Sequence, residues 1–135
     1  MYKPIHVRYA SLKRSAMGRE KMIERLVQRL FRRVYYPITA VISMDEKEKV
    51  LDLVLLDSLF ADPQDSVVAG AKAVHVVVNH PDGSMEWTQE ERTLVREIER
   101  QAGEGAFHVY LYGEDIGLIR VDRLRILRYN DENAV

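Results

Sequence analysis

Residues 74–79 most constrain what this chain can fold into, because they are apolar at almost every position. A strand with one buried face alternates apolar and polar residues, whereas a nearly continuous apolar run is typical of a strand covered on both faces. Such a strand lies in the interior of a sheet that has helices on either side. We therefore predict an α/β fold with three layers, in which a mixed sheet is flanked by helices.

Three helices are predicted, over residues 12–34, 63–73 and 88–102. The first has apolar residues at helical spacing. The second begins with Asp62 as N-cap before a proline. The third opens with the capping-box spacing of Thr88 and Glu91. Strands are predicted where β-branched and other apolar residues cluster, with further extended segments at both ends of the chain: 5–9, 38–44, 50–56, 74–79, 106–112, 116–121 and 123–129.

Length and composition bound the class of protein. With 135 residues the chain forms one domain over residues 1–135, with a basic arm and helix over about 1–34 and a frayed end at 130–135. The absence of cysteine excludes disulfides, thiolate zinc sites, iron–sulfur clusters and a cysteine nucleophile. Apolar runs fall far short of the about 18 residues of a membrane span, so we expect a cytoplasmic protein with no membrane partner.

Charge is unevenly distributed along the chain. Residues 1–33 carry a formal charge of +8, whereas residues 34–115 carry −10. In the first predicted helix the cations form a stripe opposite the apolar face, with the last of them at its edge: Lys21, Arg25, Arg29, Arg32 and Arg33. This stripe either binds a polyanion or packs against the acidic remainder of the same chain.

The segment most suggestive of chemistry follows the apolar strand. It reads Asn79-His80-Pro81-Asp82-Gly83 and leads to the capped helix that starts at Thr88. Ligand sites in open α/β sheets lie at such carboxyl ends of strands. No P-loop, Gly-x-Ser-x-Gly, His-Glu-x-x-His or dinucleotide fingerprint offers another enzyme class.

This segment resembles the JAB/MPN (JAMM) domain family, in its RadC-like branch. That branch carries a strand ending His-Asn-His-Pro-Ser-Gly and then Ser-x-x-Asp at a helix start, and its two histidines and aspartate bind zinc. His80 and its neighbours match in place, Thr88 stands for the serine, and Glu91 stands for the aspartate. His108 lies in a segment similar to a later family strand. The resemblance covers residues 19–113 and implies the cytidine-deaminase-like architecture of that family.

Two departures from the family pattern affect the implied chemistry. Val78 replaces the first zinc histidine, and Tyr35-Tyr36-Pro37 stands where the family has its general acid/base glutamate. A catalytic zinc needs three protein ligands and a water. We therefore predict a degenerate domain with no catalytic residues and no cofactor, in which His80, Thr88 and Glu91 are relic positions.

Three functions follow from these observations. The first is a non-catalytic binding module for protein or nucleic acid, in keeping with the DNA-repair association of RadC-like proteins, and with a homodimer as one form. The second is a zinc-dependent peptidase or isopeptidase in which His80 and Glu91 gain a third ligand from His108, Asp82 or Glu86. The third is a nucleic-acid-binding α/β domain that uses the basic helix.

Several residues also have a purely structural interpretation. Thr88 and Glu91 are explained by helix capping alone, and His80 by hydrogen bonds to loop backbone. His75 lies at odd spacing from His80, so it should face the opposite side of the sheet. Trp87, the only tryptophan, is expected to pack over the end of the sheet.

Overall fold

The computed structural model describes residues 5–6, 19–59 and 62–121, which form one mixed sheet and two helices. The strand order in the sheet is β1-β3-β2-β4-β5-β6. Only β4 and β5 are parallel, and the other neighbours are antiparallel. The elements are β1 Ile5–His6, α1 Arg19–Leu30, β2 Ile38–Met44, β3 Val50–Asp57, β4 Ala73–Asn79, α2 Gln89–Ala102, β5 Ala106–Gly113 and β6 Gly117–Val121.

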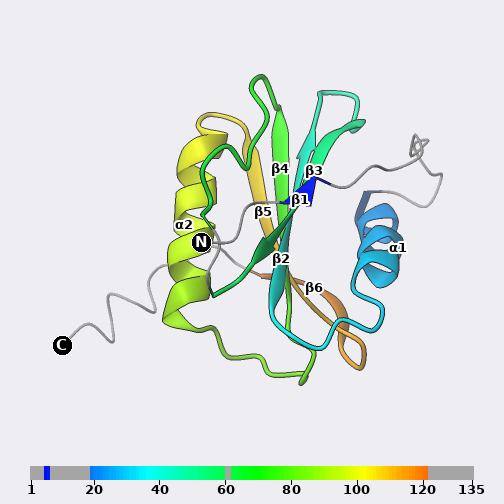
Figure 1. The fold of residues 1–135 in the computed structure, drawn as a ribbon. Coiled ribbons are helices and arrows are strands. Elements are labelled where there is room, and N and C mark those ends of the chain that lie inside the picture. The colour runs from blue at the N-terminus through cyan, green and yellow to red at the C-terminus, as the bar shows by residue number, and fades with distance from the viewer. Residues whose placement is uncertain (1–4, 7–18, 60–61, 122–135) are drawn as a thin grey trace.

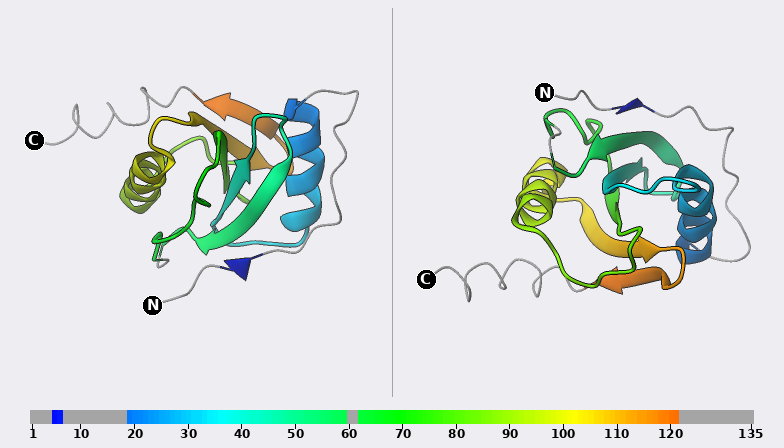
Figure 2. Two further views of the ribbon diagram at one scale, coloured as in Figure 1. Left: turned by 90° about the horizontal axis from the view of Figure 1, so that it is seen from above. Right: turned by 60° about the horizontal axis from the view of Figure 1, so that its bottom comes forward.

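The molecule has three layers, with α1 on one face of the sheet and α2 on the other (Figures 1 and 2). Each helix covers its own apolar core. On the α1 face, Ile23 and Val27 pack over Ile42, Val77 and Tyr110 and their neighbours. The α2 face is filled by a second cluster: Leu94, Val95, Ile98, Val41, Val54, Val76, Val78 and Val109. The predicted α/β class is confirmed.

β4 is buried on both faces, as its sequence indicates. Val74, Val76 and Val78 belong to the α2-face core, and Val77 belongs to the α1-face core. Because side chains alternate along a strand, β4 delivers neighbouring residues at its carboxyl end to opposite sides of the sheet. Asn79 lies toward α1, while the next residue, His80, contacts α2.

The first helix is shorter than the sequence predicts. α1 ends at Leu30, although the apolar pattern continues to Val34. Arg33 has a φ of 62°, a left-handed conformation that cannot extend a right-handed helix. Val34 therefore donates its backbone N–H to the carbonyl of Phe31 at 3.0 Å, which closes a turn before Pro37. Residues 12–18 of the predicted helix lie outside the described part of the chain.

The predicted helix over residues 63–73 is wrong. Asp65 has a φ of 57° and Gly70 a φ of 86°, so the backbone turns twice within that range. Asp62 accepts from the backbone of Gln64 at 3.1 Å, as in an Asx turn. Gln101 of α2 holds the segment, because its Oε1 accepts from the backbone N–H groups of Ser66 and Val67 at 3.0 and 3.2 Å. These side-chain bonds take the place of helical ones.

The remaining predicted strands agree with the structure to within one residue at each end. Of the extended segment at 5–9, Ile5 and His6 form β1, and residues 7–9 lie outside the described ranges. The strand expected at 123–129 and the frayed end at 130–135 also lie outside them. Across the ranges that the structure describes, neither helix has the length and apolarity needed to cross a membrane.

Replacing Ile98 by alanine should lower the free energy of unfolding by about 2–5 kcal/mol, because it leaves a cavity in the α2-face core. Ile98 is completely buried there. Thr93→Ala, at an exposed position of the same helix, is the control and should change stability little. Urea unfolding measures both, and equal effects of the two substitutions would contradict the packing described.

Candidate functional site

The carboxyl end of β4 is fixed by backbone contacts to β5 and by a tight turn. His80 donates its backbone N–H to the carbonyl of Tyr112 at 2.8 Å, so the chain stays against β5 for one residue beyond β4. Gly83 then donates to the carbonyl of His80 at 3.0 Å and has a φ of 76°. A Cβ on Gly113 would lie 3.1 Å from the carbonyl oxygen of His80. Glycine at 113 therefore permits the close approach of the two strands.

His80 and Glu91 form a buried pair at this end of the sheet. The Nε2 of His80 lies 2.5 Å from Oε2 of Glu91, and its Nδ1 lies 2.7 Å from the carbonyl oxygen of Ser84. The two residues are 5% and 1% exposed. Because a carbonyl can only accept, Nδ1 carries a hydrogen and donates it to Ser84. Both ring nitrogens are therefore used within the protein.

The pKa of His80 reflects two opposing effects. Burial alone lowers it, but the hydrogen bonds to Glu91 and Ser84, together with the charges of Glu91 and Asp82, outweigh burial and raise the pKa above its ordinary value. The contacts to Glu91 and Ser84 therefore stabilise the protonated form of the ring.

Glu91 also completes the predicted capping box at the start of α2, which is confirmed. Its Oε1 accepts from the backbone N–H of Thr88 at 2.8 Å, and the Thr88 hydroxyl accepts from the backbone N–H of Glu91 at 3.1 Å. The Trp87 ring lies 5.6 Å from the His80 ring, as expected for packing over the sheet end. One carboxylate therefore caps α2 with one oxygen and binds His80 with the other.

These residues do not fit a zinc ion of the family type. Val78, at the position of the first zinc histidine, is fully buried in the α2-face core and has no ligand atom. Both nitrogens of His80 already have partners. Among the described residues, no three His, Cys, Asp or Glu side chains are grouped closely enough to hold a metal. At the expected place of the general acid/base, Tyr35 and Tyr36 are exposed.

Of the replacement ligands suggested by the sequence, His108 lies on the opposite side of the sheet from His80. His108 is on the α1 face, where its ring stacks on His75 at 4.9 Å and its Nδ1 lies 2.8 Å from a guanidinium nitrogen of Arg120. Asp82 accepts from the backbone N–H of Ser84 at 3.0 Å, and Glu86 is exposed. The structure therefore does not bring His108 to His80.

His75 faces α1, on the opposite side of the sheet from His80. It is completely buried, and its Nδ1 lies 3.3 Å from the hydroxyl of Tyr110. Burial lowers its pKa to about 3, with smaller contributions from His108, Arg19 and Arg120. This environment keeps the ring neutral and fits a structural role.

The predicted basic stripe is only partly helical, because Lys21, Arg25 and Arg29 lie on α1 whereas Arg32 and Arg33 lie in the turn that follows it. The stripe is accessible. Its five cations are all exposed, and none of them forms an ion pair with another described residue: Lys21, Arg25, Arg29, Arg32 and Arg33. The ion pairs at α1 involve other cations, since Glu20 pairs with Arg120 and Glu48 with Arg19. Within the described ranges, the acidic residues of the chain therefore form no ion pairs with the cations of the stripe.

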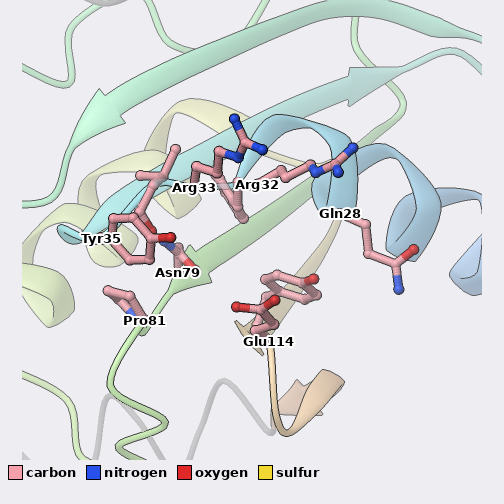
Figure 3. A pocket seen from close by; sticks show the side chains of 10 residues that line it. Gln28, Arg32, Arg33, Tyr35, Asn79, Pro81 and Glu114 are labelled. Atoms are coloured by element: carbon pink, nitrogen blue, oxygen red, sulfur yellow. The ribbon is translucent and has the colours of Figure 1, made fainter.

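A pocket of about 300 Å³ lies where α1 ends beside the carboxyl ends of β4 and β5 (Figure 3). No sequence pattern indicates this pocket, because its walls come from three distant segments: residues 28–35, 79–81 and 112–114. Arg32 and Arg33 contribute to both the stripe and the pocket. The pocket and the His80–Glu91 pair lie on opposite sides of the sheet.

Comparison with known proteins assigns no family to this arrangement. The chain matches no protein-family model, no curated protein and no solved structure.

Substituting His80 by glutamine should cost more stability at mildly acidic pH than at alkaline pH. Since folding raises the pKa of His80, its contribution to the free energy of unfolding is complete below about pH 6.5 and is lost as pH rises through the folded-state pKa. The difference between wild type and His80→Gln should therefore shrink between mildly acidic and alkaline pH. His75 is present in both proteins, so its opposite effect cancels. Urea unfolding across this range measures the difference, and a constant value would contradict the charged pair.

Thr88→Ala removes one half of the capping box and should destabilise the protein by about 0.5–2 kcal/mol. The loss should come from the start of α2, because the Glu91 backbone N–H then has no acceptor. Hydrogen exchange of the first turn of α2 measures this directly. Gln89→Ala, at the exposed neighbouring position, is the control.

Proposed function

We propose that this chain is a non-catalytic domain of the JAB/MPN type, RadC-like branch, and that it works by binding a partner. One observation carries the proposal: His80 and Glu91, which occupy zinc-ligand positions in the resemblance, bind each other at 2.5 Å. The three-layer arrangement, with a buried strand that ends at a capped helix, is compatible with that family.

The chemistry of the pair supports a structural role. Two buried ionisable groups are costly unless each satisfies the other and all their remaining polar atoms have partners. Here Ser84 and Thr88 provide those remaining partners. A zinc ion would have to displace the proton between the two side chains and would find an isopropyl group at position 78. The site is better suited to holding the β4–α2 junction together.

The surface best suited to a partner is the basic stripe on α1. Exposed cations at successive turns of a helix present positive charge along one side of it. Such a stripe neutralises phosphates of a nucleic acid and releases counterions, with little dependence on base sequence. We therefore favour nucleic acid over protein as the partner.

The alternative function is a zinc-dependent peptidase or isopeptidase, and metal content decides between the two. We expect the purified protein to hold far less than one zinc per chain, and added zinc to leave its melting temperature unchanged. Val78→His, which adds a third nitrogen or oxygen donor beside His80 and Glu91, should gain a zinc-dependent rise in melting temperature, whereas Val78→Ala should not. Stoichiometric zinc in wild type that is lost in His80→Gln would support the hydrolase.

Binding to nucleic acid should depend on the stripe and on salt. We expect DNA or RNA to bind at low salt, and affinity to fall steeply as salt rises. Arg25→Glu combined with Arg29→Glu should abolish most of this binding. The matched control is Arg96→Glu with Arg100→Glu, an equal charge change at exposed positions of α2 on the other face. Fluorescence anisotropy measures nucleic-acid binding by the wild type and by the two double variants. Absence of binding at low salt, or equal loss in both double variants, would remove α1 as the interface.

A further inference from the structure

The pocket at the end of α1 continues the basic stripe. Lys21, Arg25 and Gln28 follow one another at intervals of three or four residues, so they lie along one side of α1, and Arg32 follows in the turn after the helix. Gln28 and Arg32 also line the pocket. From Lys21 to Arg29 the helix rises about 12 Å, a length that can contact more than one phosphate of a strand. A nucleic-acid strand that binds along the stripe therefore reaches the pocket.

The walls of the pocket offer aromatic surface. Tyr35 is 77% exposed although it lines the pocket, so a ligand that covers its ring removes a large apolar surface from water. Tyr112 is 8% exposed and its ring packs against Phe31 at a centroid distance of 5.9 Å, which fixes its position. The solvent-facing ring of Tyr35 and the fixed ring of Tyr112 together suit a planar ligand.

Polar groups in the pocket suit the edge of such a ligand. In Figure 3, Asn79 lies beside Tyr35 and Pro81, and Glu114 lies across the opening from them. The amide nitrogen of Asn79 lies 3.5 Å from the carbonyl oxygen of Val34, and its residue is 2% exposed. Asn79 is therefore part of the wall, whereas the exposed carboxylate of Glu114 is placed to accept from the N–H donors that nucleobases carry at their edges. The carboxylate also repels phosphate, so a phosphate belongs at the arginine side.

Arg33 adds a cation to the lining of the pocket. Its φ of 62° is a left-handed conformation in which glycine costs least and arginine is strained. The strained turn places a guanidinium on the α1 side of the pocket.

From these observations we propose that the pocket takes one unpaired base of a single-stranded nucleic acid whose phosphates lie along the α1 stripe. The volume of about 300 Å³ accommodates one base and excludes a duplex. Stacking on an aromatic ring accepts any base, because every base has a π-face. This inference rests on the proposed nucleic-acid binding and adds that the preferred strand is single.

The test compares two neighbouring exposed tyrosines. Tyr35 lines the pocket, whereas Tyr36, which is 57% exposed, does not. Binding of a labelled oligo-dT strand and of a duplex of equal length is measured by fluorescence anisotropy at low salt. Tyr35→Ala should weaken binding of the single strand about five-fold or more and leave duplex binding unchanged. Tyr36→Ala should leave both unchanged, and melting temperatures confirm that both variants fold.

Two further measurements complete the test. Arg33→Gly should weaken single-strand binding while keeping or raising the melting temperature, because it removes a cation and relieves the left-handed strain. The mononucleotide dTMP should bind at least about ten-fold more weakly than the strand, because it cannot reach the stripe.

The outcomes separate this inference from the proposed function. Suppose that Tyr35→Ala and Tyr36→Ala change single-strand binding equally, while that binding still depends on Arg25 and Arg29. This result would overturn the base pocket and leave the stripe as the interface. Tight dTMP binding that does not depend on the stripe would also overturn it, in favour of a free nucleotide. If neither the strand nor the duplex binds at low salt, both proposals fail, and protein remains as the partner class.

Discussion

The burial of β4 on both faces is the constraint on which the rest of the structure depends. A central strand with no solvent-facing side requires a helix above and a helix below, and α1 and α2 supply them. The same alternation of side chains decides what happens at the carboxyl end of the strand. Asn79 faces the pocket beside α1, and His80 faces the first turn of α2. Two chemically different sites therefore arise from adjacent residues.

The His80–Glu91 pair illustrates how a buried polar site can be stable without a ligand. Each side chain is long enough to reach the other, and each has one further partner in the backbone. Removing either residue leaves the other buried without its main partner, which is costlier than removing both. The pair thereby ties the end of β4 to the start of α2, on the side of the sheet opposite the α1 stripe.

Much of the fold could be predicted from local sequence. β-branched runs located the strands, and the spacing of Thr88 and Glu91 located the start of α2, because both signals act over a few residues. The failures have physical causes of longer range. The segment after Asp62 is held by Gln101 of α2, and α1 ends at Leu30, shortly before the left-handed Arg33. Periodicity reveals neither feature.

The candidate site could be predicted only in part for the same reason. The sequence singled out His80 and Glu91, but their contact depends on a turn between them that spacing does not determine. The pocket could not be predicted from the sequence, since residues 28–35, 79–81 and 112–114 meet only when the sheet is assembled. By contrast, the exposed stripe followed from helical spacing, which is a local property.

The mixed sheet also bears on the order in which the chain assembles. β2–β3 and β5–β6 are hairpins between consecutive strands, so their loops are short and close rapidly. The parallel β4–β5 pair must wait for a crossover that contains α2, and closing that longer connection carries a greater entropic cost. Forming α2 early shortens the connection. We therefore expect the carboxylate that caps this helix and binds the end of β4 to influence how fast the two halves of the sheet join, as well as how firmly they stay together.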